Sequence, residues 1–194
     1  MNKSFDQLIA PILELKPRGE ILLESVPAPQ KLAPHALAMT ADVLEDAATG
    51  RFVLLHDPSG QEGWGGQWRC VTFARAAIDL EMASDPLLPE IGWAWLIESL
   101  KKFGCEYINP SGTVTRVASA SFGELVDRDE DSEIEVRASW TPTNPESIVA
   151  VLNELGMNIE VHKGENAVIK TIIKSIPFSS ALMPVPITRG FLKK

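Results

Sequence analysis

Apolar and polar residues alternate along the middle of the chain. The apolar residues Leu37, Met39, Ala41 and Val43 occupy every second position, and the same period recurs later at Ile134, Val136, Ala138 and Trp140. Alternation with a period of two is typical of strands that bury one face. We therefore predict strands over residues 35–44, 51–56, 67–78, 113–121 and 134–140, with a shorter one over 20–26.

The clearest helical period lies between residues 89 and 103. Its apolar positions recur at intervals of three and four, and they are Trp93, Leu96, Ile97, Leu100 and Phe103. Such a stripe is typical of a helix packed on a core. Pro89 suits its first turn and Gly104 suits its end. We predict further helices after Ser4, after Asn144 and over residues 166–176.

The order of these elements predicts an α+β fold. Strands joined by short turns favour one antiparallel sheet of five or six strands, and helices between the strand blocks would cover one face. We expect residues 1–176 to form a single domain. Residues 177–194 contain three prolines and would lie as an extended strap over it.

Composition narrows the class of protein. The chain has 194 residues, 45% hydrophobic, with a net charge of -8. Proteins that hold phosphate backbones are usually basic, so a nucleic acid is disfavoured as a direct ligand, as is a membrane surface. Acidic residues interrupt the first apolar run, so we expect neither a signal peptide nor a membrane span, and a cytoplasmic location. Cys70 and Cys105 are expected to be reduced core residues.

No known catalytic pattern occurs in the chain. Phosphate-binding loops, dinucleotide-binding glycine patterns, nucleophile elbows and zinc-binding histidine pairs are all missing. The three histidines lie far apart in sequence and lack partners at metal-ligand spacing. We therefore predict no cofactor, no metal site and no catalytic residues, although the sequence leaves open whether the protein is an enzyme.

The segment 52–70 has the most unusual composition. It combines four glycines with two tryptophans and several polar groups, and the candidate binding residues are His56, Asp57, Gln61, Trp64, Trp68 and Arg69. Aromatic and arginine side chains are enriched in binding hot spots. The alternatives are a structural hairpin loop whose tryptophans fold back on the core, or catalysis by His56 with Asp57 or Glu62.

Three further features have two interpretations each. Trp95 lies off the helical stripe and either packs under the strap or faces a partner. Arg116 either holds an anion or pairs with a surface carboxylate. The acidic stretch 124–133 is either a solvated loop or a site for a cation or a basic partner.

Several strings resemble a known family. They include LAPHALAMTADV (32–43), ATGRFVLLHDPSG (48–60), DPLLPEIGWAW (85–95), GTVTRVAS (112–119) and VRASWTP (136–142). These strings are similar to the actinobacterial domain-of-unknown-function 3000 family, which implies a cytoplasmic protein and carries no assigned activity. The order of elements is also similar to that of type III secretion chaperone-like domains, an analogy of topology that says little about function.

Two functions are compatible with these observations. The first is a non-catalytic domain that binds another protein or a second copy of itself. The alternative is a small-ligand-binding protein or an enzyme that uses residues 56–69. If His56, Asp57, Gln61 and Arg69 converged in a concave site, the alternative would be favoured.

Overall fold

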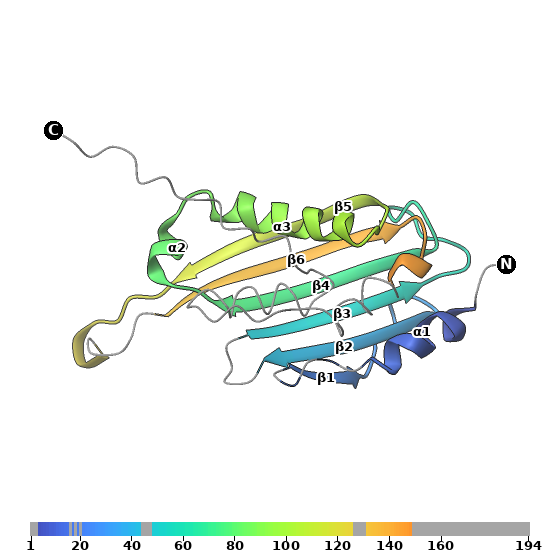
Figure 1. Ribbon diagram of the computed structural model, residues 1–194, viewed down its shortest axis with the longest axis horizontal. Coiled ribbons are helices and arrows are strands. Elements are labelled where there is room, and N and C mark those ends of the chain that lie inside the picture. Colours follow the sequence, from blue (N-terminus) through green and yellow to red (C-terminus); the bar gives the residue numbers. More distant parts are fainter. Residues whose placement is uncertain are drawn as a thin grey trace.

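The computed structural model describes residues 4–15, 17, 19, 21–43, 48–125 and 131–148. Within them lie six strands, three complete α-helices, one short 3-10 helix and the start of a further helix at residues 146–148 (Figure 1). In chain order the elements are α1 (Phe5–Leu13), β1 (Ile21–Val26), β2 (His35–Val43), β3 (Ala48–His56), β4 (Trp68–Ala77), α2 (Leu80–Ser84), α3 (Leu88–Lys102), β5 (Tyr107–Ala118), η2 (Gly123–Leu125) and β6 (Ser132–Pro142).

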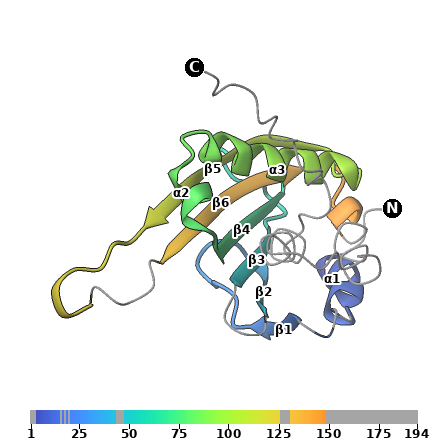
Figure 2. The ribbon, with the colours of Figure 1, turned by 60° about the vertical axis from the view of Figure 1, so that its left-hand side comes forward.

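The strands form one antiparallel sheet in the order β1-β2-β3-β4-β6-β5. This confirms the predicted α+β class. The helices lie on one side of the curved sheet, with α1 near β1 and β2 and with α2 and α3 over β5 and β6 (Figure 2). The helix predicted after Asn144 begins at residues 146–148, whereas the rest of that segment, the helix predicted over residues 166–176 and the C-terminal strap lie outside the described residues.

Strand register explains which side chains meet the helices. Paired residues on neighbouring strands point to the same face, so Leu37, Leu54, Cys70 and Trp140 share the helix-covered face. All four are buried. On the other face no described helix packs, and it carries the charged side chains of Arg51, Arg75 and Arg137.

The helices predicted after Ser4 and over residues 89–103 are both confirmed, as α1 and α3. The Ser4 hydroxyl and the Gln7 amide form the expected capping box at the start of α1. In α3, Leu96 and Leu100 are 3% and 1% exposed. Gly92 lets α3 approach the sheet, because a Cβ there would lie 3.0 Å from Cγ1 of Val114. Both cysteines are free and buried.

The boundaries of β5 differ from the prediction. The strand begins at Tyr107 rather than Thr113, because a register shift between Ile108 and Ser111 absorbs the turn-like Asn109 and Pro110. Asn109 adopts a left-handed backbone with φ of 50°, which asparagine tolerates better than most residues. Helix α2 was not predicted, because five residues are too few to show a period.

The burial of Leu100 leads to the first prediction. Replacing Leu100 by Ala leaves a cavity between α3 and the sheet and should lower the free energy of unfolding by about 2–5 kcal/mol. The matched control is Glu98→Ala on the exposed side of the same helix, which should change it by less than about 0.5 kcal/mol. Urea denaturation of both variants measures the difference, and equal effects would contradict the packing of α3.

Candidate functional site

Residues 57–67, called here the Trp64 loop, connect β3 to β4 as a folded turn. The Asp57 amide donates to the Gln67 carbonyl at 2.8 Å, and the Gly60 amide donates to the Asp57 carbonyl at 2.9 Å. The Gln67 side-chain amide donates to the Pro58 carbonyl across the loop. Gly60, Gly63 and Gly65 have φ values of 73°, 85° and 75°, a backbone region that favours glycine. The glycines thus permit a defined turn.

The carboxylate of Asp57 organises the start of this loop. It accepts hydrogen bonds from the amide and hydroxyl of Ser59 at 3.0 and 2.6 Å, and from the Gln61 side chain at 3.1 Å. The bonds from Ser59 and then Gln61 lower the pKa of Asp57, since each favours the ionised form. Gln61 also donates to the Leu32 carbonyl at 2.8 Å. Asp57 and Gln61 therefore fix the loop against the segment before β2.

The tip of the loop is held from the other side by two strands. The Trp64 carbonyl accepts from the Asn109 side-chain amide at 2.9 Å and from the Thr141 hydroxyl at 2.7 Å. Gly65 packs so closely on β5 that an added Cβ would lie 2.6 Å from Nδ2 of Asn109. The Trp64 side chain itself is half-buried. The backbone at Trp64 is thus anchored, while part of its indole reaches solvent.

Arg69 supports both of these anchors. Its Nη1 donates to the Asn109 carbonyl at 3.0 Å and to the Thr141 hydroxyl at 3.2 Å. Its Nη2 donates to the hydroxyls of Ser111 and Ser139 at 3.2 and 2.7 Å. The residue is 9% exposed, and desolvation lowers the pKa of its guanidinium. Arg69 therefore lies inside the structure and ties β4, β6 and β5 together beneath the loop.

His56 and Trp68 belong to a different environment. They pair across β3 and β4 on the helix-covered face, where their rings stack with centroids 4.0 Å apart. Phe5 from α1 and His35 from β2 complete the aromatic cluster. Trp68 is 9% exposed and is a packed residue, in contrast to Trp64. Burial first, and the nearby His35 second, lower the pKa of His56, with Asp57 opposing.

The candidate catalytic groups do not converge. His56 and Arg69 lie on opposite faces of the sheet, because Arg69 pairs with Leu55 rather than with His56. His56 Nδ1 is buried without a hydrogen-bond partner, so no dyad with Asp57 exists. The described residues also include no group of three or more side chains able to hold a metal ion.

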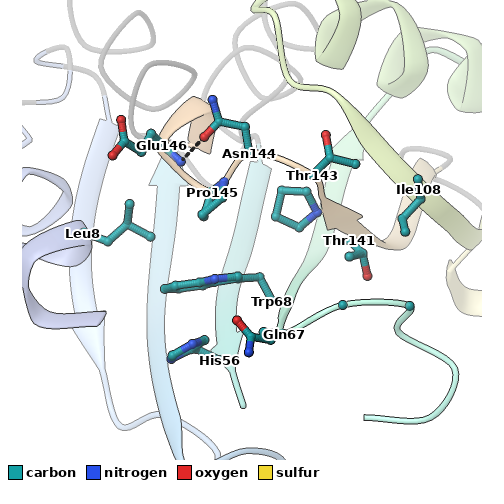
Figure 3. Close-up of a pocket in the computed structure, with 13 residues that line it drawn as sticks. Leu8, His56, Gln67, Trp68, Ile108, Thr141, Thr143, Asn144, Pro145 and Glu146 are labelled. Atoms are coloured by element: carbon teal, nitrogen blue, oxygen red, sulfur yellow. Dashed lines mark hydrogen bonds between the residues drawn. The ribbon is translucent and has the colours of Figure 1, made fainter. Parts of the chain in front are cut away.

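A cleft of about 540 Å³ opens beside the aromatic cluster (Figure 3). One wall is made by the end of the Trp64 loop and the other by the segment after β6. Its lining residues are Leu8, His56, Gly65, Gly66, Gln67, Trp68, Ile108 and the residues 141–146. Of the residues singled out from the sequence, only His56 and Trp68 line it.

The other two candidates lie elsewhere. Trp95 is half-buried and packs against the core from α3. The Arg116 guanidinium donates to the carbonyls of Asp85 at 2.7 Å and Ala83 at 3.4 Å, so it fastens the α2–α3 connection to β5. Both remain candidates by residue type, but neither adjoins the Trp64 loop.

Sequence reasoning missed Asn109 and Thr141, the two side chains that hold the Trp64 carbonyl. The dipeptide of Asn109 and Pro110 is a turn signal that could have marked an irregular backbone. Thr141 carries no such signal, because a threonine near the end of a strand is ordinary.

The network around Arg69 gives the second prediction. Arg69→Lys retains the charge but loses the planar fork that reaches four oxygens. The free energy of unfolding should fall by about 2–4 kcal/mol, since buried hydrogen bonds from a charged donor are lost. Arg75→Lys is the control. Arg75 forms an ion pair with Glu133 at the surface, where such pairs contribute little to the free energy of unfolding. Equal effects in chemical denaturation would show that Arg69 has no special role.

The half-buried position of His56 gives a prediction about pH. Its pKa is lowered in the folded state from 6.5, so the unfolded chain binds this proton more readily. The contribution to stability is therefore present above that value and is lost as the pH falls through it. The ring faces Phe5, His35 and Trp68, and the charge of Asp57 acts on it in the direction that raises its pKa. In urea denaturation His56→Phe should lose less stability on acidification than the wild type, and an unchanged pH dependence would contradict this.

Comparison with known proteins shows the family to which the chain belongs. A family model described as a protein of unknown function (DUF3000) matches residues 1–165. No curated protein and no solved structure matches the chain. Within the described residues, no helix combines the length and apolar character needed to cross a membrane. The family model covers most of the sequence, and the chain therefore belongs to the DUF3000 family.

Proposed function

We propose that this protein is a non-catalytic domain that binds another protein through the Trp64 loop. The observation that carries the proposal is the anchored loop tip, where two side chains fix the Trp64 carbonyl while part of the indole stays accessible. Binding to a fixed loop costs little conformational entropy of the loop, because the loop is already ordered. Tryptophan is among the residues most enriched in binding hot spots.

The arrangement of polar groups argues against catalysis at this loop. A reaction would need a base and a charge-stabilising group on one substrate, whereas His56 and Arg69 face opposite sides of the sheet. The Asp57 carboxylate already accepts hydrogen bonds from the side chains of Ser59 and Gln61. These groups act on the loop's own conformation, which is what a binding surface requires.

A second candidate function is the binding of a small molecule in the cleft beside His56. The observation in its favour is the imidazole, since Nδ1 is buried and has no hydrogen-bond partner. Buried polar atoms without partners are uncommon in folded proteins. A ligand in the cleft would shift the nuclear magnetic resonance signals of the His56 ring, whereas a protein bound at Trp64 would chiefly affect the loop.

The family resemblance and the acidic charge suggest where the protein acts. We infer an actinobacterial, cytoplasmic protein, with other proteins as partners and a second copy of the chain as one of them. A net charge of -8 disfavours nucleic acid as a direct ligand.

Trp64→Ala tests the proposed function. The hydrogen bonds at this position use the backbone carbonyl, so the variant keeps them and should lose less than about 1 kcal/mol of stability. Loss of a hot-spot side chain should weaken partner binding about 30-fold, the effect of about 2 kcal/mol. Affinity capture from native lysate, with quantitative mass spectrometry of the captured proteins, compares the wild type with this variant.

The matched control is Leu22→Ala, an exposed residue on β1 at the other side of the molecule. It should leave the set of captured proteins unchanged. If Trp64→Ala captures the same proteins as the wild type in the same amounts, the Trp64 loop is not the binding surface. A large loss of thermal stability in Trp64→Ala with capture intact would assign the loop a structural role.

A further inference from the structure

Among the residues that the structure describes, strand β5 forms one edge of the sheet and pairs only with β6. Ten of its twelve residues are exposed, and the other two are half-buried. Gly112 is among the exposed ones, and since glycine has no side chain, its exposure is exposure of backbone. Unpaired backbone amides and carbonyls along an edge strand are a template for another strand.

The second half of β5 lacks the usual protection of such edges. Natural edge strands are kept short, or carry lysine, proline or bulges that prevent further pairing. The bulge and Pro110 lie in the first part of β5, whereas Ser111–Ala118 pairs with β6 in unbroken register. Its one charged side chain, Arg116, is held by the carbonyls of Ala83 and Asp85. The other edge strand, β1, spans only six residues and includes the exposed Glu24.

Exposed apolar side chains gather on the same part of the chain. Among the described residues ten large apolar side chains are exposed, and seven of them lie between residues 80 and 125, namely Leu80, Leu87, Ile91, Ile108, Val117, Phe122 and Leu125. Residues 119–125, called here the arm, extend away from the body after β5 (Figures 1 and 2). Phe122 on the arm is 81% exposed and Leu125 is 56% exposed. These side chains are placed to meet another surface.

We propose that two copies of this chain associate through antiparallel pairing of their β5 strands about a two-fold axis near Val114. The same surface patch then serves both copies, as a closed two-fold dimer requires. Centred there, Thr113 of each copy lies opposite Thr115 of the other, and Arg116 lies opposite Gly112. No like charges face each other, and facing β-branched pairs stabilise antiparallel strands.

The two ends of β5 are complementary in an antiparallel arrangement. Helix α3 leads into β5 through a short connection, so Lys101 lies near the start of the strand, where Ile108 is 40% exposed. The arm lies at the opposite end. Antiparallel pairing brings the arm of each copy, with Phe122, beside Ile108 of the other. Apolar surface is then covered at both ends of the interface.

The charged residues at the two ends of β5 are also complementary. Glu124 lies on the arm, and the Asp131 carbonyl accepts a hydrogen bond from the Ser119 amide just after β5. Two acidic residues therefore lie beyond the end of β5, whereas Lys101 and Lys102 end α3 near its start. Opposite charges therefore lie at opposite ends of β5, and the two-fold arrangement places acidic beside basic twice. An unrelated extended peptide could also pair with the edge, but the charges at the two ends specify a second copy. The dimer gives a surface to the second copy named in the proposed function, but it does not rest on the Trp64 loop, because the residues that pair, 111–118, lie outside that loop.

Sedimentation equilibrium of the full chain at micromolar concentrations tests the dimer, in about 0.15 M salt. The wild type should sediment as a dimer. Thr113→Lys with Thr115→Lys places two lysines on exposed positions of β5 and should weaken dimerisation by about tenfold or more, without loss of folded structure by circular dichroism. The matched control is Leu22→Lys on the β1 edge, which should leave the dimer intact.

A second variant tests the charge argument. Lys101→Glu with Lys102→Glu should weaken the dimer most at low salt and less at high salt, because ions screen exposed charges. A monomeric wild type would overturn the proposal. So would a dimer that resists the β5 lysines or that dissociates on Leu22→Lys instead. A trapped partner other than a second copy, found at β5 by cross-linking in lysate, would replace the dimer with that partner.

Discussion

The hydrogen bonds of one buried guanidinium hold the two strand residues on which the Trp64 loop is anchored. Arg69 reaches from β4 across β6 to the irregular start of β5, where it donates to the Asn109 carbonyl and the Thr141 hydroxyl. Those same residues donate to the Trp64 carbonyl, from the Asn109 side-chain amide and the Thr141 hydroxyl. A buried charge is tolerated when its donors are satisfied, and here four neutral oxygens accept them. The sheet irregularity and the loop conformation therefore depend on each other.

Successive side chains of a strand point to opposite faces of the sheet, so adjacent residues lie in different environments. Trp68 points to the helix-covered face and stacks on His56, whereas Arg69 points to the other face and enters the hydrogen-bond network. Residues that look like one composite site in the sequence thus belong to two environments. One is an aromatic cluster beside a cleft, and the other supports an anchored loop. This separation is why we propose binding rather than catalysis.

Local patterns predicted most of the fold. The alternation in β2 and β6 and the apolar stripe of α3 depend on burial of one face, which leaves a period in the sequence. The start of β5 could not be predicted, because Asn109 and Pro110 signal a turn and only pairing with β6 shows that a bulge absorbs them. The hydrogen bonds of Arg69 could not be predicted from the sequence either, since Asn109 and Thr141 lie 40 and 72 residues away from it. Glycine and tryptophan content marked the loop as unusual, but not the groups that fix it.

We propose that the Trp64 loop is ordered before any partner binds. The most direct test is the nitrogen-15 relaxation of the backbone amides of Trp64, Gly65 and Gly66 in the free protein. The hydrogen bonds to the Trp64 carbonyl predict order parameters close to those of the neighbouring strands, at about 0.85. Values below about 0.6, typical of flexible backbone, would contradict the account.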